Sequence, residues 1–207
     1  MRVPYLHDQA IREMATYDEI YVQSWNEALK ECEAKLERGD HERALLVRSL
    51  QDFRSELDNL VNEFTDAQSK KAIMLIHPTL DQYETFAKNF VTMMENPVDV
   101  SMMWGLLFLV FKLALGDKGS VGPLSHITKW LEKIGHKLRT SNECSSNISD
   151  IEKVKGDTLE VNKEIVVLWL NIIMTFRNQS HGREVRINES AWESLTTVYN
   201  SAGKQKI

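Results

Sequence analysis

The segment Val98–Leu115 constrains the fold more than any other part of the chain. Between Met102 and Phe111 apolar side chains fall on nearly every helical face, and Asp99 and Lys112 bracket that stretch. A membrane-spanning helix needs about 20 predominantly apolar residues, so this segment is too short to cross a bilayer. A short helix that is apolar all round is typical of the centre of a bundle. We therefore predict that Val98–Leu115 is a buried central helix.

Gly105 lies in the middle of this apolar segment. Inside a helix, glycine is less favourable than alanine by roughly 1 kcal/mol. A neighbouring helix that approaches closely would explain its presence, because glycine has no side chain to hold a neighbour away. We predict such a close approach at Gly105.

Apolar residues elsewhere recur at intervals of three and four, which is the spacing of one helical face. The predicted helices cover roughly residues 17–38, 41–65, 78–94, 124–138 and 158–177. Gly39-Asp40 is interpreted as the end of the first helix and the N-cap of the second. Pro78 is interpreted as a first-turn residue of the third. Residues 66–76 either extend a helix or form a brief extended piece, and the polar residues 141–155 are expected to form an exposed loop.

These elements predict an all-α fold, an antiparallel bundle of about six or seven helices around the central helix at residues 98–115. The bundle domain is expected to cover residues 17–178. Residues 1–16 are expected to form an N-terminal arm or a short helix. Residues 179–207 are expected to be a C-terminal extension or linker, in which residues 189–200 are a candidate short helix.

Large aromatic side chains fall mostly on the apolar faces, where core packing is the simplest explanation for them. The predicted structural core consists of Trp25, Phe53, Phe64, Phe86, Phe90, Trp104, Gly105, Phe108, Trp130, Trp169 and Phe176. Cys32 lies on the apolar stripe of the first helix and is expected to be a buried thiol.

No pattern of catalytic, cofactor-binding or metal-binding residues stands out. The six histidines are scattered, and His126 and His136 are too far apart in sequence to hold one metal without other ligands. Gly203-Lys204 lacks the earlier glycine and the following Ser or Thr of a phosphate-binding loop, since Val198 and Gln205 occupy those positions. We therefore expect no enzyme activity and no cofactor, and no small-molecule substrate is evident.

The net charge and the cysteines limit which partners and which cellular compartment we expect for the protein. A net charge of −5 gives no reason to expect a nucleic-acid partner, which normally needs a concentrated basic surface. The first residues lead into a polar stretch rather than the apolar core of a signal peptide. The two cysteines follow no metal-ligand spacing. These features predict a cytoplasmic protein in a reducing environment.

With its helices taken in order, the chain resembles the helical N-terminal domains of fungal NOD-like receptors, signal-transducing STAND proteins with a NACHT nucleotide-binding module. It is most similar to the uncharacterised domain that contains a Trp-Gly pair and to the related Goodbye type. The resemblance covers about residues 20–178. It is carried by Trp25-Asn-Glu-Ala28, Phe53 to Phe64, Pro78 to Phe90, Ile165 to Phe176 with Arg177-Asn178, and above all Ser101-Met-Met-Trp104-Gly105-Leu-Leu-Phe-Leu-Val-Phe.

The resemblance implies a non-enzymatic signalling or effector domain that acts through protein–protein association, with a protein partner or with itself. Such domains function in self/non-self recognition (heterokaryon incompatibility) or in regulated cell death. A helical enzyme whose site is assembled from scattered residues is a third and weaker interpretation.

The alternative from a different class is a membrane-acting cell-death executioner that binds anionic lipid. Met1–Thr16 lacks the long glycine-rich apolar leader of such proteins, which speaks against it. The candidate lipid contacts lie on the polar side of the predicted helix at 124–138 and are Lys129, Lys133, Lys137 and Arg139. An ordinary amphipathic bundle helix explains the same pattern.

Overall fold

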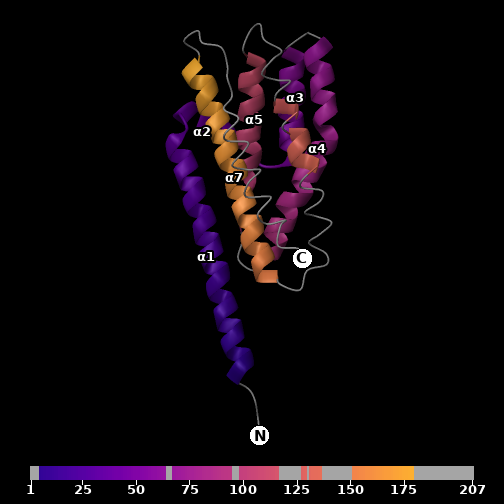
Figure 1. Cartoon of the computed structure of the whole chain (residues 1–207). Helices are drawn as coiled ribbons and strands as arrows, with labels where there is room; N and C mark the ends of the chain where they lie inside the picture. Colours follow the sequence, from indigo (N-terminus) through magenta and orange to yellow (C-terminus); the bar gives the residue numbers. More distant parts are fainter. Residues whose placement is uncertain are drawn as a thin grey trace.

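In the computed structural model, helices and their connections make up the described part of the chain (Figure 1). That part comprises residues 5–63, 67–94, 98–116, 127–129, 131–136 and 151–179, although the side chains of residues 5–17, 63, 67–72, 75, 116, 151–153, 178 and 179 are not included. The helices are α1 (Tyr5–Lys35), α2 (Arg38–Ala44), α3 (Leu50–Glu63), α4 (Ala67–Met93), α5 (Ser101–Gly116) and α7 (Ile151–Gln179). Residues 127–129 and 131–136 are also helical. The predicted all-α helical bundle is confirmed.

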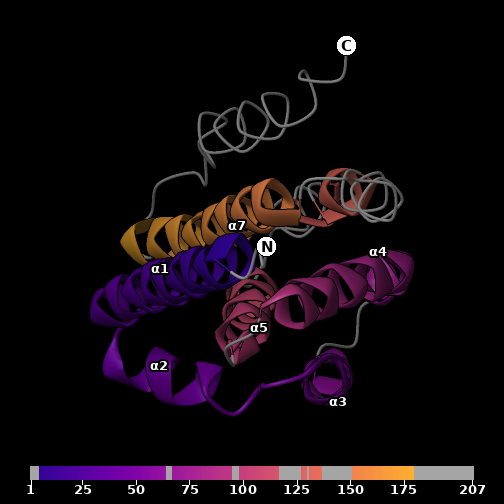
Figure 2. The ribbon, with the colours of Figure 1, turned by 90° about the horizontal axis from the view of Figure 1, so that it is seen from below.

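The apolar helix α5 lies at the centre. Viewed end-on, it is surrounded by α1, α2, α3, α4 and α7 (Figure 2), and it packs directly against α2, α3 and α7. Every side chain from Met102 to Phe111 is buried, with at most 4 % of its surface exposed. The helix begins at Ser101, whose backbone N–H donates a hydrogen bond to the Asp99 carboxylate (2.8 Å). Among the described residues, no helix combines the length and apolar character that a membrane crossing requires.

Gly105 lies directly against the C-terminal end of α2. A methyl group added to Gly105 would lie 2.7 Å from the carbonyl carbon of Ala44 and would overlap the carbonyl oxygen. Ala44 is itself buried, with 1 % of its surface exposed. The predicted close approach at Gly105 is therefore confirmed, and the neighbour is helical backbone.

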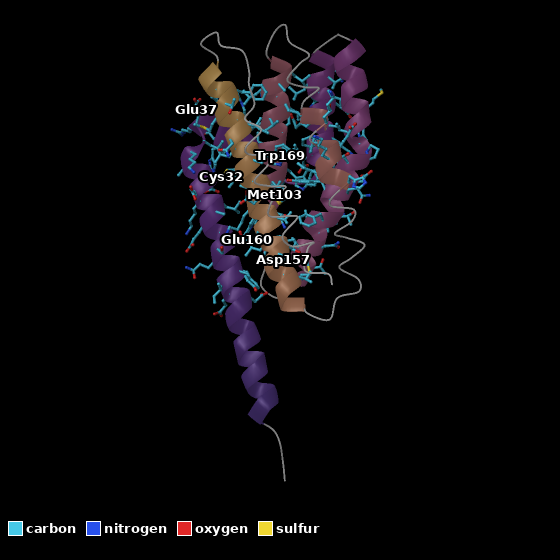
Figure 3. The ribbon with its side chains drawn as sticks, viewed as in Figure 1. Cys32, Glu37, Met103, Asp157, Glu160 and Trp169 are labelled. Atoms are coloured by element: carbon cyan, nitrogen blue, oxygen red, sulfur yellow. The ribbon has the colours of Figure 1, made fainter. Side chains whose placement is uncertain are left out.

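Aromatic side chains link α5 with three other helices, α3, α4 and α7. Trp104 lies edge-on to Tyr83 of α4, with ring centroids 5.1 Å apart, and contacts Phe53 of α3 at 6.0 Å. Phe53 also meets Phe111 edge-on at 5.8 Å. Trp169 of α7 donates its indole N–H to the Tyr83 hydroxyl (3.2 Å). Trp169 lies inside the bundle where α7 packs on α5 (Figure 3).

The described members of the predicted core are all buried. They are Trp25, Phe53, Phe86, Phe90, Trp104, Gly105, Phe108, Trp169 and Phe176. Phe64 and Trp130 lie outside the described residues.

The second predicted helix is two helices in the structure, α2 and α3. The Ser49 hydroxyl accepts a hydrogen bond from the backbone N–H of Asp52 (3.1 Å) and donates one to the Asp52 carboxylate (2.9 Å). That carboxylate also accepts the backbone N–H of Arg48 (3.1 Å). These bonds occupy donors at the start of α3, so the helix begins there. Leu46, on the predicted apolar stripe, is consequently 75 % exposed, and Val47 is buried instead.

The boundary predicted at Gly39-Asp40 is wrong. The turn between α1 and α2 is Leu36-Glu37, and Gly39 and Asp40 both lie inside α2. Asp40 does not cap a helix through its side chain, because its carboxylate is buried against Arg177.

The prediction that Pro78 lies in a first helical turn is also wrong. Pro78 is inside α4, which begins eleven residues earlier at Ala67. Most of residues 66–76 therefore belong to this helix. A proline in a helix interior removes one backbone hydrogen bond. Pro78 is exposed at the bundle surface, where its ring displaces no core side chain.

Two further boundaries differ from the prediction. Helix α7 begins at Ile151, so the last part of the predicted loop is helical, and Lys155 is buried. Helix α1 begins at Tyr5, so most of the stretch expected as a separate arm or short helix continues directly into the first helix. The candidate short helix at residues 189–200 lies outside the described residues.

We expect Gly105→Ala to lower the free energy of unfolding by about 1–3 kcal/mol, because the backbone of Ala44 cannot move aside as a flexible side chain can. Urea denaturation would measure the change. Gly39→Ala is the matched control: it also lies in a helix, and an added methyl group there would have no atom within 4 Å. That control should gain up to about 1 kcal/mol from helix propensity. Equal effects of the two substitutions would refute the close contact.

Candidate functional site

The helices α1 and α7 lie side by side and run in the same direction (Figures 1 and 2). Their polar contacts keep a nearly constant separation along the sequence. The Asp18–Lys155 pair is separated by 137 residues and the Ser24–Lys163 pair by 139. We call these contacts the α1–α7 seam, formed by Asp18, Tyr21 and Ser24 of α1 and Lys155, Gly156 and Lys163 of α7. The α1–α7 pair is therefore parallel.

A buried ion pair lies in this seam. The Lys155 ammonium is 3.4 Å from the Asp18 carboxylate, and the two residues expose only 5 % and 0 % of their surface. Removing both charges from water costs several kcal/mol per ion, and their mutual attraction roughly offsets that cost only when they meet. A shifted pairing of α1 on α7 would leave both charges buried and separated. The ion pair therefore specifies the register of the two helices.

The same side of α7 continues with buried polar groups. Lys155, Thr158 and Asn162 follow one another at intervals of three and four residues, so they share one helical face. The Asn162 side-chain amide donates to the Thr158 carbonyl (2.8 Å). Its Oδ1 has no hydrogen-bond partner among the described protein atoms. This end of α7 thus packs with polar groups, whereas the end that carries Trp169 packs with apolar ones.

A second buried carboxylate fixes the other end of α7. Asp40 of α2 is 2 % exposed, and Arg177 donates to it from Nε (3.0 Å) and from a terminal nitrogen. Arg177 also lies 3.6 Å from the Glu37 carboxylate, which Figure 3 labels near this end of α7. The hydrogen bond to Asp40 raises the pKa of Arg177, so the guanidinium stays charged. Arg177 is in the last turn of α7, where a cation also favours the helix dipole.

Apolar side chains also attach α1: Trp25 and Cys32 are buried, and Tyr21, Val22 and Leu29 are partly buried against the core. Trp25 is fully buried, donates its indole N–H to the Asp99 carbonyl (2.8 Å) and meets Phe90 edge-on at 5.5 Å. Cys32 is 2 % exposed, as the sequence predicted. Burial raises the pKa of the Cys32 thiol to about 12, so it is un-ionised at neutral pH and is a poor nucleophile.

Few of the described side chains of α1 are fully buried. Between Asp18 and Lys35 the fully buried positions are Asp18, Trp25 and Cys32. They are spaced by seven residues, and one of the three is charged. Toward its beginning, α1 extends past the ends of the other helices (Figure 1). It is therefore a peripheral helix with a narrow contact face.

The described part of the chain also gives no candidate metal site. No group of three or more His, Cys, Asp or Glu residues there is placed to hold a metal ion.

The candidate lipid contacts are placed only in part. Lys129 and Lys133 are exposed, whereas Lys137 and Arg139 lie outside the described residues. The apolar side of the same segment is buried in the bundle through Ile127, Leu131 and Ile134. Binding to lipid through that side would require the segment to leave the core.

The charged residues of these contacts were missed by the sequence patterns. Asp18 is a charged residue at the start of the helix predicted at residues 17–38, and Lys155 lies in the stretch 141–155 that was expected to form a loop. The spacing of Asp18, Trp25 and Cys32 is the signal that could have placed Asp18 on the buried face. No local signal pairs Arg177 with Asp40, because the partners lie 137 residues apart.

Comparison of the chain with protein-family models, with curated proteins and with solved structures finds no match. The resemblance to fungal receptor domains stays a prediction.

We expect Asp18→Asn to lower the free energy of unfolding by about 3–5 kcal/mol, because the buried Lys155 ammonium loses the charge of the Asp18 carboxylate. Lys155→Met should have a similar effect, and the double variant should lose less than the sum of the two. Lys88→Met is the control. It breaks the exposed Lys88–Glu84 pair (3.0 Å) and should change stability by less than about 1 kcal/mol. If Asp18→Asn were no more disruptive than this control, the seam would not hold a buried ion pair.

Proposed function

We propose that this chain is a non-enzymatic signalling module that acts through protein–protein association, and that α1 is the element that makes the contact. The observation that carries the proposal is the way α1 is attached. A continuous apolar core holds α3, α4, α5 and α7 together. Helix α1 adds Trp25 and Cys32 to it, packs the partly buried Tyr21, Val22 and Leu29 against it, and otherwise meets α7 through the polar seam.

A polar seam sets the position of α1 more than it strengthens the attachment. When α1 leaves the bundle, water can hydrate Asp18 and Lys155, and their desolvation cost is recovered. Opening an apolar contact of the same area has no such compensation. We therefore expect α1 to separate from the bundle at a lower free energy than any helix of the core.

Helix α7 of a second copy of the chain presents the same contact surface to α1. If α1 of one copy binds α7 of another in the same register, the Asp18–Lys155, Ser24–Lys163 and Trp25 contacts all form again. Exchange of an identical element between copies is a low-cost route to association because few contacts are lost. The proposed output is therefore self-association through exchanged α1 helices.

This proposal agrees with what the family resemblance implies. In the receptors that the chain resembles, the N-terminal helices pass on a signal once the rest of the molecule assembles. The distinctive Trp104-Gly105 pair has a structural role here, since Gly105 admits the backbone of Ala44 and Trp104 contacts Phe53 and Tyr83. This packing gives α1, the helix that we propose makes the contact, a fixed core from which to separate.

Covalent fixation of α1 tests the proposal. Ser24 and Lys163 lie 3.2 Å apart at their side-chain ends, so Ser24→Cys with Lys163→Cys, in a Cys144→Ser background, can be joined by a short bismaleimide. The same variant capped with N-ethylmaleimide is the matched control, since α1 stays free. Sedimentation velocity over a concentration series should show dimers for the capped protein and monomers for the cross-linked one.

Two results would contradict the proposal. One is equal association of the cross-linked and capped proteins, because α1 would then not be the exchanging element. The other is a capped protein that remains monomeric at every concentration, because self-association would then be absent.

A further inference from the structure

The joint between α1 and α2 is a helix break that the local sequence does not require. Helix α1 ends at Lys35 and α2 begins at Arg38, so Leu36 and Glu37 form the joint. Both are good helix formers, and neither is glycine or proline. Glu37 has an extended backbone (φ −64°, ψ 147°), and its side chain makes no capping hydrogen bond to α2. Helix α2 leaves α1 at an angle (Figure 2). The break therefore depends on contacts with the rest of the bundle.

Two sets of contacts favour the bent joint. The Arg177 guanidinium of α7 lies 3.6 Å from the Glu37 carboxylate and donates from Nε to Asp40 of α2 (3.0 Å). The His41 ring of α2 lies 3.8 Å from the Glu33 carboxylate of α1, so this pair spans the joint. In one continuous helix, Glu33 and His41 would lie about 12 Å apart along the axis, at roughly 1.5 Å per residue. The bend thus allows a contact that a straight joint would lose.

A straight joint would gain backbone hydrogen bonds instead. Each helix end leaves N–H or carbonyl groups without the partners that they have in a helix interior. In a continuous helix, the N–H groups of residues 37–40 would bond to the carbonyls of residues 33–36. While α1 is packed on α7 and α2 on α5, the two helices cannot align, so these bonds cannot form. Release of α1 from α7 removes that restraint.

We propose that α1 and α2 join into one continuous helix when α1 leaves α7. Helix α2 keeps its place, because Asp40 still binds Arg177 and Ala44 still packs on Gly105. The straight helix then carries Trp25 away from its own bundle and toward a second copy, whereas a bent joint returns it to the same chain. Short connections of this kind favour exchange between copies. The inference rests on the proposed release of α1 and adds the switch that directs it.

The substitution Arg38→Pro separates the two forms of the joint. Arg38 is the first residue of α2, a position that accepts proline, and the extended Glu37 has the backbone that a residue before proline favours. The bent form therefore tolerates this change. In a continuous helix the proline would be interior, where it removes the hydrogen bond to the Ala34 carbonyl and clashes with that group. Arg38→Ala is the matched control, because it removes the same exposed side chain and permits both forms.

Double electron–electron resonance measures the joint directly. Spin labels are attached under native conditions to Gln23→Cys and Glu42→Cys, two exposed positions, in the Cys144→Ser background. Asp18→Asn is added to weaken the seam and release α1. With Arg38→Ala, we expect a population at about 29 Å, the length of a straight helix from residue 23 to residue 42 at roughly 1.5 Å per residue. With Arg38→Pro, that population should fall at least fivefold in favour of shorter distances.

Two results would overturn the inference: absence of the 29 Å population with Arg38→Ala, or an equal population with Arg38→Pro. Sedimentation velocity of the two Arg38 variants without Asp18→Asn gives a second test with an intact seam. Arg38→Pro should lower the association constant at least tenfold relative to Arg38→Ala, and equal, measurable association would also overturn the inference. The proposed function fails separately if both variants stay monomeric while the 29 Å population forms, because α1 then straightens without exchanging.

Discussion

The rest of the structure depends on one requirement, the complete burial of α5. This helix has no polar face, so every side of it must be covered by another element. The backbone of α2 covers it at Gly105, α3 and α4 cover it through Phe53 and Tyr83, and α7 covers the remaining side. Those helices therefore pack against α5 as part of the core. Because α5 is then fully enclosed, α1 packs mainly on the flank of α7. It reaches the core through Trp25 and Cys32, and Tyr21, Val22 and Leu29 pack against that core.

This arrangement divides α7 between two environments. Its apolar residues from Ile165 to Phe176 pack inward, whereas Lys155, Thr158 and Asn162 present buried polar groups where α1 crosses. Arg177 closes the opposite end by neutralising the buried Asp40. The charges fix where α1 and α2 sit on α7, and the apolar residues supply the stability. We therefore expect a firm core and one helix, α1, whose position is well defined but whose attachment is weaker, which is the property that the proposed association requires.

Much of the core could be read from the sequence because periodicity reports it directly. The burial of α5, the close neighbour at Gly105 and the buried aromatic rings all follow from apolar spacing and from glycine's missing side chain. The boundaries were harder, because local hydrogen bonds decide them. The bonds between Ser49 and Asp52 start a new helix where the apolar stripe runs on without a break, and Pro78 is accommodated because it faces outward. The seam was not predicted. Asp18 and Lys155 each resemble solvated surface charges until the fold brings them together across 137 residues.

The central claim is that α1 separates from the core as a unit. Native-state hydrogen exchange followed by NMR, over a series of low denaturant concentrations, tests it most directly, because it resolves local opening from global unfolding. The account predicts that amides of α1 between Asp18 and Lys35 exchange through a shared opening whose free energy is lower than that of the α5 amides. The α5 amides should exchange only through global unfolding. Equal free energies of opening for the α1 and α5 amides would contradict the account, because α1 would then be an inseparable part of the core.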